Sequence, residues 1–218
     1  MRTPAATLTR SYTYAWQQYK KYFLHLFLVG LITWFAWFPT NLGYLDEMSA
    51  GMVALSIFIA AYGLLVLPVI YYGSAHLYVQ YMRDERADIR GVFAGFQTNY
   101  LNIVLANLLV FAICGIGFVL LIVPGIIFAC RLAFVPYLVM DKGLDPVGAI
   151  EKSWNMTRGH GWRIFAMFLV AIPLLLIGFM LLFVGVFFAA LLVSCAFASL
   201  YHAVDLQEQA LLNGNGTA

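Results

Sequence analysis

Residues 100–140 have the sequence YLNIVLANLLVFAICGIGFVLLIVPGIIFACRLAFVPYLVM, in which Arg131 is the only charged residue. A helix needs roughly 20 apolar residues to cross a bilayer, so these 41 residues are too long for one span and suit two. Residues that favour a tight turn collect near the middle of the stretch: Gly115, Gly117, Pro124 and Gly125. We therefore expect two transmembrane helices, at about 100–118 and 120–140.

The same pattern returns in residues 162–204, where Gly178 and Gly185 mark the expected turn between spans at 162–181 and 183–204. Two further apolar segments come earlier in the chain. Residues 22–38 end in an aromatic belt typical of a membrane interface, and residues 50–80 exceed one bilayer thickness, with Pro68 as a candidate kink. The sequence thus predicts six transmembrane helices arranged as three hairpins.

Composition supports this all-α, polytopic fold. Hydrophobic residues make up 63% of the 218 residues and charged residues 10%, whereas soluble domains are about 45–50% apolar and about 25% charged. One small globule cannot bury that much apolar surface, so the lipid bilayer is the solvent of a single integral domain over residues 1–218. The net charge of +2 is too low for a nucleic-acid binder.

The basic residues predict the orientation. If the N-terminus is cytoplasmic, the three outer loops hold no Lys or Arg, and eleven of the twelve basic residues lie inside. Cytoplasmic loops of membrane proteins carry such an excess of positive charge. We therefore expect a multi-pass protein of a bacterial inner membrane with both termini in the cytoplasm. The inside residues are Arg2, Arg10, Lys20, Lys21, Arg83, Arg86, Arg90, Lys142, Lys152, Arg158 and Arg163.

Each predicted hairpin follows a segment of mixed aromatic, apolar and charged residues: 8–21, 88–99 and 144–158. The third has Asp145 and Pro146 where a helix would begin. Such amphipathic segments are typical of helices that lie on a membrane surface. We expect a cytoplasmic interfacial helix before each hairpin, which also suggests a threefold internal repeat. Around them, Asp84, Glu85 and Asp88 alternate with Arg83, Arg86 and Arg90, which predicts a self-neutralised surface segment.

Arg131 is the residue that most strongly suggests a site. It lies ten residues before Asp141, about 15 Å deep at a helical rise, and no Asp or Glu lies within any predicted span. Its remaining partners are backbone carbonyls, Asn102, Asn107, tyrosine hydroxyls such as that of Tyr137, water, or a bound anion. The structural alternative is an arginine that snorkels or caps carbonyls that nearby prolines set free.

Prolines strengthen the interpretation of Arg131 as part of a site. Pro124 and Pro136 bracket it, so its helix is expected to be short, kinked or partly re-entrant. Interrupted helices beside polar groups are where transporters bind their substrates. The predicted ligand-binding residues are therefore Arg131, Asn107, Asn102 and Tyr137.

We find no pattern that indicates an enzyme. The sequence lacks a phosphate-binding loop and a Gly-x-Ser-x-Gly elbow, and its four histidines do not pair at helical spacing. The three cysteines lie apart in apolar runs, which favours helix packing over a zinc site. We expect no catalytic residues, no metal and no cofactor.

One series of residues resembles a known family: Pro124-Gly125, then Arg131, Tyr137 and Asp141, then Ala149 and Ser153-Trp154. The order is similar to that in the membrane domain associated with some bacterial glycerophosphoryl diester phosphodiesterases, and in the YciC-like inner-membrane proteins. The resemblance covers about residues 85–205 and implies a six-helix bacterial membrane protein. This chain has no room for the phosphodiesterase barrel, so that activity is not implied.

Two functions follow as hypotheses. The first is a non-enzymatic membrane protein that binds or transports an anionic small molecule or lipid through Arg131 and Asn107. The alternative is a scaffold without a ligand that docks a protein partner through its interfacial helices, with Trp16 and Trp154 as anchors. Small residues spaced by four on the last span favour close helix packing, within one chain or in a homo-oligomer: Ala190, Ser194 and Ala198.

Overall fold

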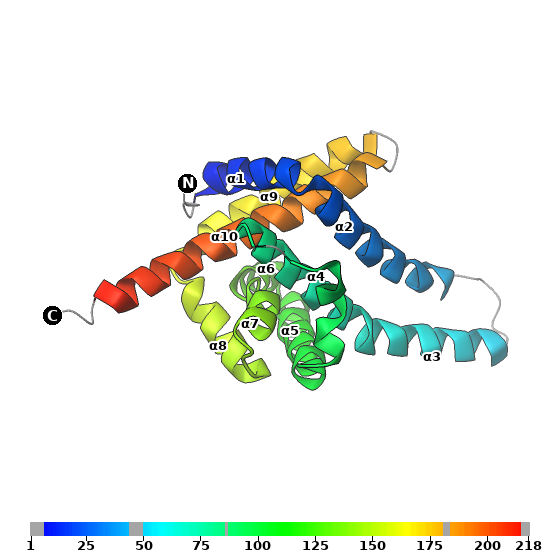
Figure 1. Cartoon of the computed structure of the whole chain (residues 1–218). Helices are drawn as coiled ribbons and strands as arrows, with labels where there is room; N and C mark the ends of the chain where they lie inside the picture. Colours follow the sequence, from blue (N-terminus) through cyan, green and yellow to red (C-terminus); the bar gives the residue numbers. More distant parts are fainter. Residues whose placement is uncertain (1–6, 44–49, 86, 181–183, 215–218) are drawn as a thin grey trace.

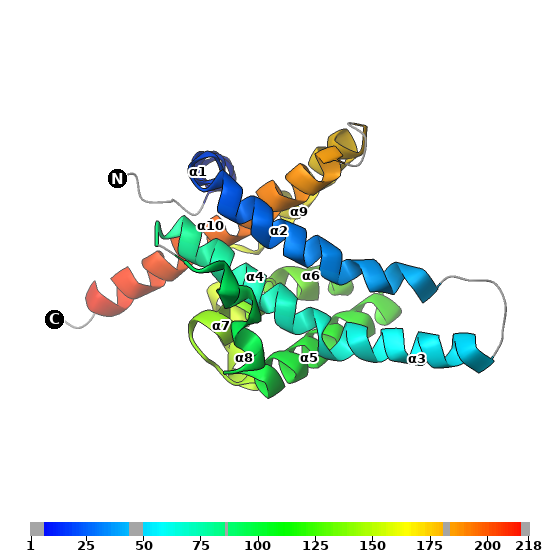
Figure 2. The same ribbon diagram turned by 45° about the vertical axis from the view of Figure 1, so that its right-hand side comes forward.

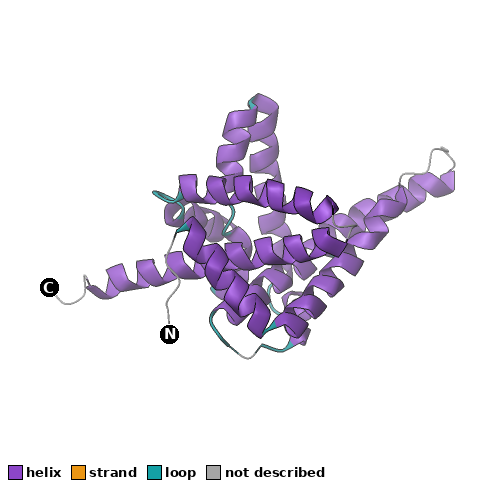
Figure 3. Cartoon of the chain, turned by 90° about the horizontal axis from the view of Figure 1, so that it is seen from above, coloured by secondary structure: helices purple, strands orange, loops and turns teal. Residues whose placement is uncertain are grey.

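The computed structural model describes residues 7–43, 50–85, 87–180 and 184–214. Within these ranges all regular structure is helical, as Figure 3 shows. The elements in chain order are α1 (Leu8–Lys21), α2 (Phe23–Trp37), η1 (Phe38–Gly43), α3 (Ala50–Leu65), α4 (Leu67–Met82), η2 (Ile89–Phe96), α5 (Tyr100–Leu120), α6 (Ile122–Arg131), α7 (Val135–Asp141), α8 (Pro146–Met156), α9 (Gly161–Met180) and α10 (Val184–Gly214).

Six helical segments of the described chain are long and apolar enough to cross a membrane. They fit a multi-pass membrane protein and confirm the prediction of an all-α chain with six such segments. Their bounds are Phe23–Thr40, Gly51–Met82, Tyr100–Leu120, Ile122–Asp141, Gly161–Met180 and Gly185–Ala210.

Glycines mark the two predicted breaks. Leu121, in an extended conformation, separates α5 from α6, and a Cβ added to Gly117 would lie 3.0 Å from the Cα of Gly125. The end of α9 and the start of α10 meet in the same way, since a Cβ on Gly178 would lie 2.6 Å from the carbonyl oxygen of Gly185. In both places the missing side chain lets two backbones come into contact.

Prolines explain two interruptions. The predicted kink at Pro68 is confirmed, because α3 ends at Leu65 and α4 begins at Leu67. The span predicted over 120–140 is found as Ile122–Asp141, and its expected interruption is seen as well, because residues 132–134 separate α6 from α7. The ring of Pro136 would clash with the carbonyl of Leu132 in a continuous helix. Pro124 breaks nothing, because it lies in the first turn of α6, where no backbone N–H is needed.

The predicted segments between the spans are also seen as elements. α1 has the predicted bounds of 8–21, and α8 begins with Asp145 accepting a hydrogen bond from the backbone N–H of Gly148 at 3.3 Å. The segment predicted over 88–99 is a 3-10 helix, η2, rather than an α-helix. It packs directly on α4, where a Cβ on Gly73 would lie 2.0 Å from the carbonyl oxygen of Val92.

α4 is the central helix of the molecule. Thirteen of its sixteen residues are buried, and it contacts α2, α5, α7, α10 and η2. α1 packs on α10, and its Tyr12 hydroxyl donates to the carbonyl of Met167 in α9 at 3.3 Å. Figure 1 shows α1 lying over α9 and α10, while Figure 2 shows it nearly end-on and therefore crosswise to α2, α3 and α9.

Candidate functional site

A cavity of about 370 Å³ lies beside α4, in a bundle of α4, α5, α6, α7, α9 and α10. We call it the polar cavity because six of its lining side chains carry a hydroxyl or amide group: Tyr71, Tyr72, Tyr78, Asn107, Tyr137 and Ser194, the last of which donates within its own helix to the carbonyl of Ala190. Its volume falls in the range of about 300–1,000 Å³ that ligand-binding pockets occupy.

The polar groups of this cavity lack protein partners. Within the described chain, none of its four tyrosine hydroxyls and no atom of the Asn107 amide makes a hydrogen bond. A hydroxyl or amide removed from water without a partner costs roughly 1–3 kcal/mol on protein mutational scales. Five such groups around one space indicate that water or a ligand supplies the missing bonds.

The broken helix forms one wall of the polar cavity. Leu132 and Ala133 lie in the break between α6 and α7, and Pro136 and Tyr137 follow it. Tyr71 and Phe168 are 47% and 40% exposed although they also line the cavity, so its rim reaches the surface of the bundle. In a membrane that surface faces lipid.

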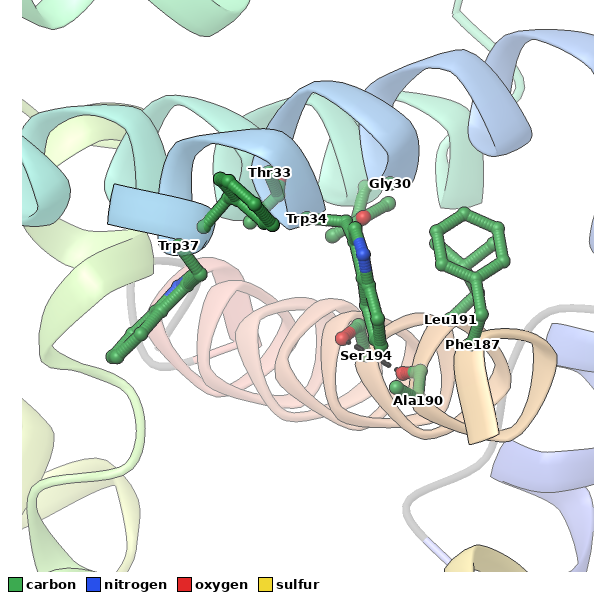
Figure 4. A pocket seen from close by; sticks show the side chains of 10 residues that line it. Gly30, Thr33, Trp34, Trp37, Phe187, Ala190, Leu191 and Ser194 are labelled. Atoms are coloured by element: carbon green, nitrogen blue, oxygen red, sulfur yellow. Dashed lines mark hydrogen bonds between the residues drawn. The ribbon is translucent and has the colours of Figure 1, made fainter. Parts of the chain in front are cut away.

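A second cavity of about 380 Å³ lies between α2 and α10. We call it the apolar cavity. Figure 4 shows Trp34 extending from α2 toward Ala190 and Ser194 of α10, with Trp37 further along α2. Tyr78 and Ser194 line both cavities, so the two spaces are neighbours. A smaller space of about 230 Å³ shares Asn107 with the polar cavity and Trp37 with the apolar one.

The structure brings two of the four predicted site residues together. Asn107 and Tyr137 line the polar cavity, whereas Asn102, on α5, lines neither cavity. Arg131 is the last residue of α6, and its side chain points away from the cavity that its neighbour Leu132 lines.

Arg131 instead faces α8. Its guanidinium carbon lies 5.4 Å from the centre of the Trp154 ring, and its Nη1 atom is buried without a hydrogen bond. Its backbone carbonyl, freed by the break, accepts a hydrogen bond from the hydroxyl of Ser153 at 2.7 Å. The hydroxyl of Thr157 makes a longer contact with it at 3.4 Å and shares its one proton with the carbonyl of Ser153, at 2.8 Å. A buried hydroxyl of α8 thus caps this carbonyl, and the Arg131 side chain donates no hydrogen bond to a carbonyl within the described chain.

An ion-pair cluster that the sequence reasoning missed joins the ends of α4, α7 and α10. Arg83 donates to both carboxylate oxygens of Asp141, at 2.5 and 2.8 Å, and to Asp205 at 3.3 Å. Lys142 pairs with Asp205 at 2.5 Å, and the Tyr201 hydroxyl donates to Asp141 at 2.9 Å. Burial disfavours the charge on Arg83, but Asp141 outweighs it and raises the pKa of Arg83.

The expectation of a self-neutralised segment around residues 83–90 is therefore wrong for Arg83 and Asp84, while Arg86, which belonged to it, lies outside the described residues. Arg83 pairs with the distant Asp141 and Asp205, and Asp84 accepts hydrogen bonds from Lys21 and from the hydroxyl of Tyr22 at 2.6 Å. These two hydrogen bonds lower the pKa of Asp84. The available signal was that Asp141 and Asp205 each directly follow a predicted span, at 120–140 and 183–204, and that Lys142 is next to Asp141.

Two further observations concern the chemistry of the chain. No group of three or more His, Cys, Asp or Glu side chains in the described ranges is placed to hold a metal ion. The three cysteines are free, and those at positions 130 and 195 are buried.

The family model described as "Domain of unknown function (DUF7847)" matches residues 87–213, more than half of the chain. The match begins just before η2 and ends in α10. It includes Asn107 and Tyr137 but not the three cavity tyrosines of α4. No curated protein and no solved structure matches the chain.

Proposed function

The chain belongs to the family described as Domain of unknown function (DUF7847), and we propose that it is a non-enzymatic membrane protein that binds or transports an anionic lipid or small molecule. One observation carries this proposal: the polar cavity gathers the unpaired groups of Asn107, Tyr137 and three tyrosines of α4. Hydroxyls and an amide N–H are donors for the oxygen atoms of a ligand head group.

We propose the following placement in the membrane. The chain crosses a bacterial inner membrane as three hairpins, with both termini in the cytoplasm, and α1, η2 and α8 lie at the inner surface. The crosswise direction of α1 in Figure 2 supports an interfacial position for that helix. The basic residues of the segments between the hairpins support the orientation.

Arg131 supports an anionic rather than a neutral ligand. It forms no ion pair within the described chain, and one of its nitrogen atoms is buried without a partner. An uncompensated positive charge in a medium of low dielectric constant favours negative charge nearby. In this proposal Arg131 attracts the ligand through its electrostatic field, because its guanidinium lies on the ring of Trp154. Asn107 and Tyr137 make the direct contacts with the ligand.

Native mass spectrometry in mild detergent tests the proposal. We expect a discrete bound mass on the wild-type protein that is lost from the double variant Asn107→Leu/Tyr137→Phe. Arg131→Gln should reduce the bound fraction of an anionic ligand and leave that of a neutral one unchanged.

The control is Asn102→Leu, because it makes the same change on the same helix outside the cavity. The Asn102→Leu protein should carry the same bound mass as the wild-type protein. An equal bound mass on every folded variant, or none on the wild-type protein, would overturn the proposal.

A docking role is the second candidate, and one residue favours it. Trp16 on α1 is 46% exposed, and the ammonium group of Lys20 lies 5.0 Å from the centre of its ring. Trp154, the other expected anchor, instead packs on Arg131 and Phe128. If α1 docks a protein partner, Trp16→Ala should abolish a complex that survives mild detergent.

A further inference from the structure

We infer that the ligand is an elongated amphiphile, with its head group in the polar cavity and one hydrocarbon chain in the apolar cavity. This inference rests on the proposed function and names the class of ligand more closely. Three observations support it. The two cavities adjoin, their polar side chains differ in whether they already have hydrogen-bond partners, and the apolar cavity is narrow.

The cavities meet at one partition. Tyr78 of α4 and Ser194 of α10 line both spaces, and Tyr78 is only 6% exposed. Its hydroxyl makes no hydrogen bond within the described chain, so no bond has to be broken for the ring to change position. A chain that starts in the polar cavity and passes Tyr78 enters the space between α2 and α10.

Two of the three hydroxyls that line the apolar cavity, those of Thr33 and Ser194, are already satisfied, and the third is that of Tyr78 at the partition. Thr33 donates to the carbonyl of Val29 at 2.9 Å and lies 2.9 Å from the hydroxyl of Ser74. Ser194 donates to the carbonyl of Ala190 at 3.0 Å, the bond drawn in Figure 4. These walls therefore offer a ligand mainly aromatic and aliphatic surface, whereas the polar cavity offers five unpaired groups. This difference assigns the head group to one cavity and the hydrocarbon to the other.

The space between α2 and α10 suits one chain. A Cβ on Gly30 would lie 2.3 Å from Cδ2 of Leu191, so the two helices touch at this point of the cavity wall. Trp34 and Phe187, whose ring centres are 5.9 Å apart, close another side. A head group with a single chain fits this geometry better than one with two chains side by side.

Alkyl phosphates of increasing length test the inference, with hexyl, decyl and tetradecyl phosphate as the probes. Brominated chains quench tryptophan fluorescence on contact. The part of the quenching of the purified full-length protein that is lost in the variant Trp34→Phe/Trp37→Phe therefore reports a chain beside these two residues. On the wild-type protein each further buried methylene should tighten binding by about three- to fourfold until the cavity is full.

The decisive variant is Ala190→Phe, because Ala190 lies exposed on the apolar cavity and a phenyl ring would occupy that space. This variant should still bind hexyl phosphate, but its affinity should not rise for phosphates with longer chains. Ala112→Phe is the matched control, since Ala112 is an exposed alanine on α5 outside both cavities, and it should behave like the wild type. Ala190→Leu, a smaller filler, should reach its plateau at a shorter chain and serves if the phenylalanine variant does not fold.

Two results would overturn the inference while leaving the proposed function intact. In one, wild-type protein binds hexyl and tetradecyl phosphate equally well; in the other, both Ala190 variants keep the full dependence on chain length. The head-group site would then persist without a chain site, and Asn107→Leu would still abolish binding. If no alkyl phosphate binds the wild-type protein, both proposals fail.

Discussion

Arg131 shows how one residue can be important for a reason that its sequence position does not reveal. Its carbonyl accepts a hydrogen bond from Ser153, and its guanidinium rests on Trp154. Residues next to each other in a helix point about 100° apart. Leu132 can therefore face the polar cavity while Arg131 faces α8, and no periodicity argument fixes this direction at a helix break.

The bond from Ser153 to the carbonyl of Arg131 should matter for stability. Ser153 is fully buried, so Ser153→Ala leaves a buried acceptor with only the longer contact from Thr157. We expect a loss of about 1–3 kcal/mol in the free energy of unfolding, measured in detergent. Ser56→Ala is the control, because Ser56 makes an exposed bond within its own helix, and its stability should stay near that of the wild type.

Asp84 gives the chain a pH-dependent contact between α1 and the end of α4. Because Lys21 and Tyr22 lower its pKa, the carboxylate stabilises the fold above its ordinary pKa, and this contribution is lost as pH falls through the lowered value. Asp84→Asn should lower the unfolding temperature at neutral pH and converge with the wild type in acid. Asparagine tolerates the positive φ of 63° at this position.

Glu151→Gln is the control for the pH experiment, because Glu151 is exposed on α8 and takes part in no ion pair within the described chain. It should not reproduce the pH-dependent difference. A constant gap between Asp84→Asn and the wild type at all pH values would show that the carboxylate charge is not the cause.

Helix bounds and breaks were largely predictable because they depend on local chemistry. Glycines and prolines marked the ends of α5 and α9 and the kink at Pro68. The cavity was only partly predictable. Asn107 was predicted as a polar residue within a span, and Tyr137 belonged to the motif that carries the family resemblance. Tyr71, Tyr72 and Tyr78 were not predicted, because tyrosine near a span end is usually interfacial. Their meeting with α5 and α7 depends on packing that no single segment encodes.

The contact between Gly117 and Gly125 predicts a large difference between two glycines of one helix. A Cβ at position 117 would lie 2.7 Å from the ring of Phe128 and 3.0 Å from Gly125, whereas at Gly115 it would meet nothing within 4 Å. Gly117→Ala should therefore lower the free energy of unfolding by about 1–3 kcal/mol. Gly115→Ala should be neutral or stabilise by up to about 1 kcal/mol. Unfolding in detergent compares them, and equal effects would contradict this packing.

The cluster around Arg83 should be a main support of the end of the bundle where α4, α7 and α10 meet. Arg83→Gln leaves the carboxylate of Asp141, only 8% exposed, without its cation, which should cost about 3–5 kcal/mol. Arg90→Gln changes an exposed arginine in the same segment and should cost less than about 0.5 kcal/mol. Thermal unfolding compares the two variants. A much larger loss of stability in Arg83→Gln indicates a structural cluster, whereas equal losses would indicate a general effect of the lost charge.

At the scale of the whole molecule, the proposed orientation predicts a labelling pattern. Single cysteines at Leu121, exposed between α5 and α6, and at Glu151, exposed on α8, should lie on opposite sides of the membrane. In intact bacterial cells a membrane-impermeant maleimide should label only Leu121→Cys, and Glu151→Cys only after permeabilisation. The wild-type chain gives the background from Cys114, Cys130 and Cys195, and the reverse pattern would invert the proposed topology.

The cluster around Arg83 also sets an order of events during biosynthesis. Asp141 is translated 58 residues after Arg83, and Asp205 follows Arg83 by 122 residues. Until Asp205 has been translated, Arg83 can pair only with Asp141, and Lys142 lacks its carboxylate partner. A chain truncated before α10 would therefore lack one of the two carboxylates, and the cluster closes only once Asp205 has been made.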